Sequence, residues 1–399
     1  MFKTNLNAMP RNVWILGVAA LLTDLSSEMI HSVLPIFLVL ALGASTVTVG
    51  LIEGVAESVA SIMKLFSGAL SDWLGTRKTL VVAGYGLSTI VKPLFALAYS
   101  PAVVLMARTA DRLGKGVRGA PRDALVADSV GPELRGAAFG LRQSLDTTGA
   151  FLGPAVALVL MLVTHCNYRL IFWCAVIPAV IAVLLLAAGV QEKKSTRDDG
   201  IRSPLRWRSL KTLGRQFWIL VVAALLFNLG NSSDAFLLLR ARQLGVPTEL
   251  VPLTMVVMNI TYMFSAYPAG VLSDRVGRFG LLLGGFIVYG IVYAGFAVVS
   301  TTWAVWILFA IYGLYLGMSQ GVLLALVSDQ VPAQQRGTAF GFINLASGLT
   351  LLPSSLLAGV LWAQISPVAP FAIGSFFAFA SVAFLLLFFK DKTAPAQAD

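Results

Sequence analysis

Apolar residues fill long runs along almost the whole chain, and short polar stretches separate one run from the next. A helix that crosses the hydrocarbon core of a membrane needs about 20 mainly apolar residues. Closely spaced runs of this length indicate helices, because the strands of a membrane barrel are only about half as long. We therefore predict an all-α membrane protein with twelve transmembrane helices, at residues 12–39, 47–71, 78–99, 102–128, 136–163, 168–189, 215–242, 249–272, 279–300, 302–328, 337–363 and 367–389.

The polar and basic segment 191–214 interrupts this pattern, and the sequences on its two sides resemble each other. RNVWILGVAALL at Arg11–Leu22 returns as RQFWILVVAALL, displaced by 204 positions. GALSDWLGTRK at Gly68–Lys78 and ALVADSVGPELRGAAFG at Ala124–Gly140 return with displacements of 202 and 201 positions. Three matches in the same order indicate an internal duplication. The prediction is two pseudo-symmetric six-helix bundles, residues 1–190 and 215–399, joined by a cytoplasmic linker at 191–214.

Composition and charge support a membrane protein and exclude other classes. Of the 399 residues, 57% are hydrophobic and 12% are charged, about half the charged fraction of a soluble domain. The net charge of +10 does not indicate a nucleic-acid partner, because lysine and arginine gather in alternate loops, the positive-inside pattern. We expect a multi-pass protein of a bacterial-type inner (cytoplasmic) membrane, with both termini in the cytoplasm. Two cysteines predict no disulfide framework, and the N-terminal stretch shows no cleavage site of a removable signal peptide.

The fourth predicted span departs from the apolar pattern, because it carries positive residues every three or four positions. On a helix they form one continuous stripe, made of Arg108, Arg112, Lys115, Arg118 and Arg122. A charge at the bilayer centre costs at least about 2.5–3.5 kcal/mol, so such residues normally face a bundle interior or a water-filled path. Arg108, Arg112 and Lys115 are therefore predicted to bind substrate. In an alternative arrangement, Arg118, Arg122 and Asp123 lie at the cytoplasmic headgroups.

Acidic residues on the first predicted span are candidates for carrying a coupling proton. Asp24, Glu28 and His31 share one face, since their spacing is i, i+4, i+7. Burial favours the neutral form of a carboxyl and a nearby arginine favours its charged form, and a proton carrier needs that competition. Asp24, close to mid-span, is the acid that we expect beside Arg112. A permanent structural ion pair is the alternative.

Further charged residues lie on the second and fifth spans, which hold Glu53 and Glu57, and Arg142 and Asp146, respectively. Because an unpaired buried charge is strongly destabilising, most of these charges must neutralise each other. Glu57 is a candidate for substrate binding. Lys92, on the third span, is expected to snorkel outward. The candidates for proton coupling are Asp24, Glu28 and Asp146.

The second half carries fewer charges, and its candidate ligand-binding residues are amides and aromatic rings. Asn228 occupies the repeat position of Asp24, 204 positions further along. The other residues predicted to bind substrate here are Tyr262, Tyr312, Tyr315 and Asn344. A cavity with a charged wall and an aromatic, Met-rich wall suits an amphiphilic organic ligand with an anionic group. The alternative is that these side chains face lipid or pack between helices. No metal site is predicted, because single-helix methionines without a cysteine or second histidine are a weak basis for one.

The repeated segments GALSDWLGTRK and GVLSDRVGRFG resemble the cytoplasmic loop signature of the major facilitator superfamily, G-x-x-x-D-x-x-G-R-[RK]. The span count, the duplication and the linker resemble the same superfamily. The resemblance implies a gating role for residues at and near these loops: Gly68, Asp72, Arg77, Arg135, Asp274 and Arg278. Gly68 and Gly270 are expected to let neighbouring helices approach closely, and Asp72 is expected to meet a basic group such as Arg135.

Two further motifs bear on direction and substrate. The G-x8-G-x3-G-P signature of that superfamily's exporting antiporters is similar to the arrangement in the fifth span of Gly140, Gly149, Gly153 and Pro154. The signature normally closes with two more glycines, where this chain has Ala157 and Leu158. The fourth span resembles the superfamily's basic cavity-lining motif, with Arg112 and Gly116 at the matching positions.

Together these features imply a proton-coupled secondary transporter of a small amphiphilic or anionic organic compound, exporting it by proton antiport. The alternative is a proton-coupled importer of an organic anion or metal chelate. We expect no cofactor besides the proton gradient, since the sequence has no G-x-x-x-x-G-K-[ST] phosphate loop. A membrane enzyme lacks support, because only two histidines exist and no Ser/His/Asp order or metal cluster is seen. The expected partners are the substrate, protons and the lipid bilayer, and the expected state is a monomer.

Overall fold

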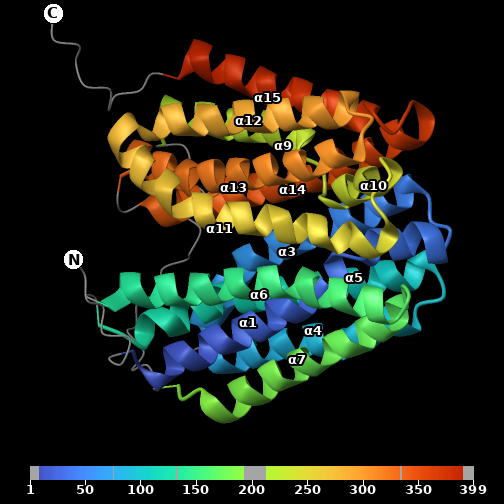
Figure 1. Ribbon diagram of the computed structural model, residues 1–399. Helices are drawn as coiled ribbons and strands as arrows, with labels where there is room; N and C mark the ends of the chain where they lie inside the picture. The colour runs from blue at the N-terminus through green and yellow to red at the C-terminus, as the bar shows by residue number, and fades with distance from the viewer. Residues whose placement is uncertain (1–8, 75, 132–133, 193–212, 333–334, 390–399) are drawn as a thin grey trace, which may run out of the picture. The chain divides into compact units, whose positions relative to one another are not determined.

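The computed structural model of the chain describes residues 9–74, 76–131, 134–192, 213–332 and 335–389, without the side chains at 69, 72–74, 274–276, 320 and 336–337 (Figure 1). Within these ranges the regular structure is helical, and no strand occurs. The first half contains α1 Arg11–His31, α2 Leu34–Ile36, the π-helix η2 Phe37–Ala41, α3 Thr46–Leu74, α4 Arg77–Leu97, α5 Pro101–Asp128, α6 Arg135–Val163 and α7 Tyr168–Gly189. The second half contains α9 Arg215–Gly230, α10 Ala235–Gln243, the short 3-10 helix η4 Thr248–Leu250, α11 Val251–Val276, α12 Arg278–Val298, α13 Thr302–Gln330, α14 Arg336–Gln364 and α15 Ala369–Phe388.

These helices confirm the prediction of an all-α, multi-pass membrane protein. Among the described residues, 11 helical segments are long and apolar enough to cross a membrane. The one remaining predicted span is the fourth, which corresponds to α5. This helix has 28 residues, but it carries too many charged residues to count among the 11 apolar segments. A helix of this length extends about 42 Å, and the hydrocarbon core is only about 30 Å thick. The length of α5 is therefore sufficient, and its charges need compensation from protein.

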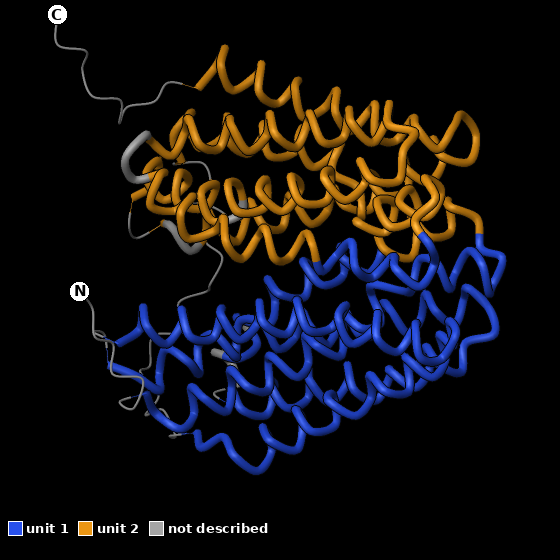
Figure 2. Tube along the Cα trace, in the orientation of Figure 1, with its two compact units in different colours: residues 1–44, 55–204, 247–256 blue, residues 45–54, 205–246, 257–399 orange. Residues whose placement is uncertain are grey.

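The chain divides into two compact units, each described here by itself (Figure 2). Unit 1 contains residues 1–44, 55–204 and 247–256, and unit 2 contains residues 45–54, 205–246 and 257–399. The predicted bundles 1–190 and 215–399 differ from these units at two short segments. Residues 45–54, at the start of α3, group with unit 2, and residues 247–256, at the start of α11, group with unit 1.

The same helix pairs recur in the two units. In unit 1, α1 packs against α6 and α7, and α4 packs against α5 and α7. In unit 2, α9 packs against α14 and α15, and α12 packs against α13 and α15. Each pair of unit 2 occupies the repeat position of a pair in unit 1. The duplication in the sequence thus corresponds to a duplicated packing arrangement.

Two spans that we predicted as continuous helices are interrupted. The first span leaves the α-helix at Ser32–Val33 and continues through a short helix containing Pro35 and a π-helical turn. Proline lacks a backbone N–H, and its ring clashes with the carbonyl four residues earlier, so α1 ends ahead of Pro35. The seventh span is interrupted at Asn231–Asp234, between α9 and α10. Asn, Ser and Asp side chains compete with the helix for backbone groups, and the Ser233 hydroxyl accepts from the Ala235 N–H at 3.3 Å.

Both cysteines are free thiols, as expected. Cys166 lies in the turn between α6 and α7, and its thiol donates to the Glu249 carboxylate at 3.4 Å. Burial, reinforced by this carboxylate, raises the pKa of the Cys166 thiol to about 11. Because the thiolate is the reactive form of cysteine, the raised pKa disfavours reaction of Cys166 at neutral pH, and the thiol serves as a hydrogen-bond donor in unit 1.

Two glycines of the fifth-span motif allow α6 to lie directly against α1. A Cβ at Gly149 would stand 2.5 Å from the Leu21 carbonyl oxygen, and a Cβ at Gly153 would stand 2.6 Å from the Glu28 Cβ. A Cβ at Gly140 would meet nothing within 4 Å among the described residues. The motif glycines at 149 and 153 are therefore required by packing, whereas the one at 140 is not.

Gly153→Ala should lower the free energy of unfolding by about 1–3 kcal/mol, because an extra methyl in a tight contact forces the two helices apart. Gly140→Ala is the matched control and should leave stability unchanged or raise it by up to about 1 kcal/mol, through the better helix propensity of alanine. Thermal unfolding of the purified protein in one detergent compares the two variants. Equal stability of both would contradict the close packing of α6 on α1.

Candidate functional site

Helix α5 buries most of its charged stripe inside unit 1. Arg108 is 1% exposed, Arg112 is 3% exposed, and Asp111 and Arg118 are each 4% exposed. Such burial needs partners from neighbouring helices, since an uncompensated charge in the interior is strongly destabilising. Lys115 differs from these residues, because its side chain is exposed. The stripe is thus a mainly internal feature with one accessible cation.

Helix α4 holds the buried side chain of Arg118 inside unit 1. Its guanidinium donates to the Ser88 hydroxyl at 2.8 Å and lies over the Tyr85 ring, 4.4 Å from the ring centroid. The Ser88 hydroxyl in turn donates to the Asp111 backbone carbonyl at 3.0 Å. A cation over an aromatic face gains electrostatic energy when water is excluded. Arg118 therefore fastens α5 to α4.

Arg112 forms an ion pair with Glu57 of α3. The Arg112 Nε lies 3.0 Å from the Glu57 Oε1, and the two side chains are 4% and 32% exposed. We had assigned Glu57 to substrate binding, and it forms an ion pair here. The expectation that Asp24 also lies beside Arg112 stays a prediction; the charge of Asp24 acts on Lys115 and Asp146.

The charges of three acids act on the accessible lysine. Glu57, Asp24 and Glu28 all favour the charged form of Lys115, and Arg112 opposes them. Glu28 also faces His31 on its own helix, with 3.4 Å between the His31 Nδ1 and a carboxylate oxygen. The predicted cluster of α1 acids and α5 cations is therefore present in unit 1. It combines an exposed cation with carboxylates and an imidazole, which are groups that can exchange protons.

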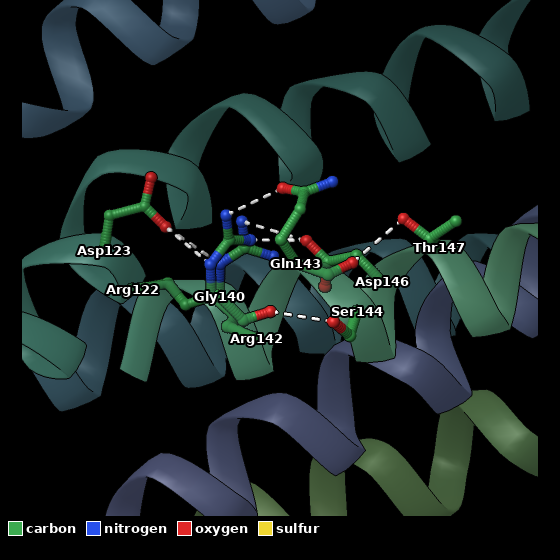
Figure 3. A network of polar contacts seen from close by, with 8 residues as sticks. All are labelled: Arg122, Asp123, Gly140, Arg142, Gln143, Ser144, Asp146 and Thr147. Atoms are coloured by element: carbon green, nitrogen blue, oxygen red, sulfur yellow. Dashed lines mark hydrogen bonds and ion pairs between the residues drawn. The ribbon is translucent and has the colours of Figure 1, made fainter. Parts of the chain in front are cut away.

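Asp146, the third proton-coupling candidate, belongs to a compact network between α5 and α6 (Figure 3). Arg122 lies 3.3 Å from Asp123 and 3.9 Å from Asp146. Arg142 lies 3.7 Å from Asp123 and pairs directly with Asp146, one helical turn away. Two arginines thus balance two aspartates. The network ties α5 to α6, and the proton-coupling role of Asp146 stays a prediction.

Lys92 is a correction to the sequence analysis. We expected it to snorkel outward, but its side chain is 1% exposed. Its ammonium donates to the Ser27 hydroxyl at 3.1 Å, and its charge acts on Asp111. Helix α4 directs this position into the unit, and Asp111 supplies the compensating charge that makes burial tolerable.

In unit 2 the predicted tyrosines form the centre of a buried aromatic cluster. Tyr312 and Tyr315 are 2% and 5% exposed, and they pack against Tyr289 and Tyr293, which are 0% and 1% exposed. The Tyr312 hydroxyl donates to the Asp234 carboxylate at 2.8 Å. The sequence analysis missed Tyr289 and Tyr293, although their spacing of four residues in one span was a readable signal.

The other residues of the second half that we predicted to bind substrate are less enclosed. Asn228 and Tyr262 are half-buried, and Asn344 is exposed. Their side chains lie on α9, α11 and α14 of unit 2.

The signature loops hold matching ion pairs at the ends of two helix pairs. In unit 1, Arg77 at the start of α4 pairs with Asp128 at the end of α5. In unit 2, Arg278 at the start of α12 pairs with Asp329 at the end of α13, at 2.7 Å. Both residues of the second pair stand 201 positions after those of the first. The duplication has therefore preserved a charge contact as well as a sequence.

The remaining gating predictions have mixed outcomes. The side chains of Asp72 and Asp274 lie outside the described residues, and Arg135 is exposed. The expected close helix approach is absent at both signature glycines. A Cβ at Gly68 would have only an ordinary contact at 3.4 Å, and a Cβ at Gly270 would meet nothing within 4 Å among the described residues.

The start of the linker adds a contact that the sequence analysis missed. The Glu192 carboxylate accepts from the backbone N–H groups of Arg77 and Lys78, at 2.6 and 3.2 Å. A carboxylate at a helix N-terminus satisfies unpaired donors and complements the helix dipole. Asn12 and Gln191 also exchange two hydrogen bonds, at 2.7 and 3.1 Å. The first linker residues thus bind the signature-loop end of unit 1.

The Arg112–Glu57 pair should show energetic coupling in a double-mutant cycle. Arg112→Gln and Glu57→Gln together should cost less than the sum of the single changes, by about 1–3 kcal/mol, because either single change leaves one buried charge behind. A second cycle of Arg112→Gln with Asp123→Asn is the control, since Asp123 lies about 16 Å along the helix and should be additive. Thermal unfolding measures both, and additivity in the first cycle would refute the pair.

Arg77→Gln and Arg278→Gln should loosen the ends of α5 and α13, respectively. Partly exposed pairs contribute up to about 1 kcal/mol, so amide hydrogen exchange near Asp128 and Asp329 should rise about two- to fivefold. Arg135→Gln, which changes an exposed arginine near the same loop of unit 1, should leave these rates unchanged. Mass-spectrometric exchange resolves each helix end, and identical rates in all three variants would show that the pairs are energetically silent.

Comparisons with known proteins agree with the fold and with the signature loops. A profile of the Major Facilitator Superfamily matches residues 16–354 and 236–399. An uncharacterised MFS-type transporter of Methanocaldococcus jannaschii is 36% identical over 386 residues, which cover 95% of this chain and 94% of the relative. A probable 4-methylmuconolactone transporter of Cupriavidus pinatubonensis is 28% identical over 356 residues, covering 86% of this chain and 81% of the relative.

Two further similarities support narrower conclusions, because one covers less than half of the chain and the other has low sequence identity. The multidrug resistance protein MdtH of Yersinia enterocolitica is 27% identical over 184 residues, covering 46% of this chain and 44% of the relative. The crystal structure of the nucleoside transporter NupG has a TM-score of 0.77 at 13% identity, covering 94% of this chain and 98% of that chain. The structural likeness concerns the fold alone. With the profile match and the nearly full-length relative, it leads to one conclusion: the chain belongs to the major facilitator superfamily and is a membrane transporter, not an enzyme.

Proposed function

We propose that this transporter is coupled to protons and exports a small amphiphilic or anionic organic compound by antiport. The observation that supports the proposal is the cationic stripe of α5, with its one exposed member, Lys115, among the carboxylates of Asp24, Glu28 and Glu57. In this proposal the protein acts as a monomer in an inner membrane of bacterial type. Both termini lie in the cytoplasm, as the distribution of lysine and arginine favours.

The balance of charge within unit 1 favours an anionic group on the ligand. Among the described side chains, the stripe and its neighbours include eight cations: Lys64, Lys92, Arg108, Arg112, Lys115, Arg118, Arg122 and Arg142. The acids close to them number six: Asp24, Glu28, Glu57, Asp111, Asp123 and Asp146. The excess is two positive charges. An anion at the exposed Lys115 would reduce this excess, and an apolar body would suit the surrounding span residues.

Antiport requires that substrate and proton compete for the same groups. Asp24 and Glu28 are suited to that role, because their carboxylates stand beside Lys115 and can either accept a hydrogen bond from the substrate or take a proton. Protonation of both acids would remove their negative charges and weaken the hydrogen bonds that hold the donor groups of the substrate. Two observations support export: the packed glycines Gly149 and Gly153 of the antiporter-like motif, and the similarity to a protein named for multidrug resistance.

A proton-coupled importer of an organic anion is the second candidate, and the Arg112–Glu57 pair favours it. A substrate carboxylate that bound Arg112 would displace Glu57, and the displaced carboxylate would then bind a proton more tightly. Substrate and proton binding would cooperate, which is what symport of an anion needs. The two candidates therefore differ in how affinity changes with pH.

The proposed function predicts a proton flux that depends on Asp24. In everted membrane vesicles with an acidified lumen, adding a transported compound should raise the luminal pH in the wild type. Asp24→Asn should abolish that response while compound binding persists. An amide cannot carry the proton, but its carbonyl oxygen and the Glu28 carboxylate can still accept hydrogen bonds from the compound, and Asn228 occupies the repeat position in unit 2. A panel of aromatic carboxylates, lactones and amphiphilic drugs serves as the probe, with thermal shift reporting binding. An unchanged response in Asp24→Asn would remove Asp24 from coupling.

The direction of the pH effect on affinity separates the exporter from the importer. For a bound member of the panel, antiport predicts that affinity falls as pH falls, because protons and substrate compete. Affinity that instead rises as pH falls, and loses this dependence in Arg112→Ala, would overturn antiport and establish anion symport.

A further inference from the structure

Lys64 of α3 is a second exposed lysine beside the charged stripe of α5. A Cβ built at Gly119 of α5 would stand 3.6 Å from the Lys64 Cγ and 3.9 Å from its Cε. The apolar stem of Lys64 therefore lies along α5 at a position that has no side chain. A long charged side chain can cover a helix with its stem while its charged end stays in water, and the exposure of Lys64 fits that arrangement.

Helices α3 and α5 run in the same direction where they touch in unit 1, and their contacts advance in step. Glu57 pairs with Arg112, and seven residues further along both helices Lys64 lies over Gly119. Between these two contacts, a Cβ at Gly116 would stand 2.7 Å from a backbone carbonyl oxygen of α3. Only a residue without a side chain fits there, so Gly116 allows the close approach that brings Lys64 onto α5.

The register of the two helices places Lys64 close to Lys115. Lys115 and Gly119 are four residues apart, so they share one face of α5 and lie about 6 Å apart along its axis. Lys64 is therefore about one helical turn from the exposed Lys115. Arg112 and Arg122 on either side pair with carboxylates, whereas neither lysine ammonium forms an ion pair or a hydrogen bond with the part of the chain that the structure describes.

A ligand that covers these two lysines removes the water around both of them. A cation that loses its water needs an anionic partner, because an uncompensated charge away from water is strongly destabilising. The acids nearest to Lys115 are partly engaged elsewhere, since Glu57 pairs with Arg112 and Glu28 faces His31. A ligand with one anionic group would leave one of the two ammoniums without a partner, and a ligand with two would match both.

We propose that Lys64 and Lys115 together bind a dianionic organic substrate, each ammonium holding one of its two negative charges. The inference rests on the proposed function, because it specifies the anionic compound and adds Lys64 to the residues that bind it. Lysine ammonium binds carboxylate and phosphate oxygens alike, through charge-assisted hydrogen bonds. The shared chemistry is therefore a double negative charge, carried by two carboxylates or by one phosphate monoester.

The test measures binding of matched anions to the purified full chain by thermal shift, at constant ionic strength and one alkaline pH. The dianions are succinate, glutarate, isophthalate and phenyl phosphate, and each is compared with its monomethyl ester, which carries one charge on a similar body. At least one dianion should reach half-saturation at a concentration about tenfold below that of its ester, the effect of one more charge-assisted hydrogen bond. Preference among the dicarboxylates would indicate two separated anionic groups, and preference for phenyl phosphate a single doubly charged group.

Three variants locate the preference, and thermal unfolding without ligand checks that each is folded. Lys64→Gln should bring the preferred dianion to within about twofold of its ester, because one lysine meets only one charge. Lys115→Gln should do the same for the same reason. Lys78→Gln is the matched control, since it removes an equal charge from the start of α4 in the same unit, and it should keep the preference of the wild type within about twofold.

The proposal would be overturned if no dianion of the panel bound more tightly than its ester, or if the preference survived in Lys64→Gln. An equal loss of preference in Lys78→Gln would also overturn it, because total charge and not the lysine pair would then be responsible. In each of these cases, binding of the monoanionic esters would leave the proposed transport of an anionic compound intact. Absence of binding by every anion and amphiphilic drug would contradict the proposed function as well.

Discussion

The burial of charge on α5 is the constraint on which the rest of unit 1 depends. A helix with this many cations is stable in a low-dielectric interior only if neighbouring helices bring compensating groups. Each neighbour supplies a different one: Glu57 from α3 for Arg112, Ser88 and Tyr85 from α4 for Arg118, and the α6 network for Arg122. Hydrophobic packing alone would allow α5 to rotate or slide against its neighbours. These polar contacts specify one register.

The helices could be predicted from sequence because the length of each apolar run is set by the thickness of the hydrocarbon core that the helix crosses. The partners of the charges could not, since an ion pair depends on which faces of different helices meet. The pair of Arg112 with Glu57 was not predicted, because it depends on how α3 packs against α5. Lys92 was misjudged for the same reason. The sequence around a lysine in an apolar run does not show whether its side chain points toward lipid or toward a buried aspartate, as that of Lys92 does.

The interruptions show a second limit of sequence analysis in membranes. A run of apolar residues long enough to span the bilayer predicts a crossing, but it does not show whether the crossing is continuous. Four consecutive polar residues, Asn231–Asp234, were the available signal in the seventh span, and Pro35 was the signal in the first. We did not recognise either interruption, because apolar residues on both sides of each signal continue the pattern of a membrane span. Unwound backbone is tolerated at such depth only where protein groups replace the lost helical hydrogen bonds, as Ser354 and Ser355 do.

The two duplicated halves differ in the residues of their interiors, but they share the ion pairs at the ends of matching helices. Arg77–Asp128 and Arg278–Asp329 occupy the same repeat positions and make the same contact, so the ends of these helix pairs retain one design. Between the ends, Lys92 and Asp111 of unit 1 are replaced by Tyr293 and Tyr312 in unit 2. Because helix packing is the same in both units, this exchange alters electrostatics without altering the fold. Two units with the same helix packing therefore differ in the polarity of their interiors: unit 1 encloses paired charges, and unit 2 encloses phenol rings.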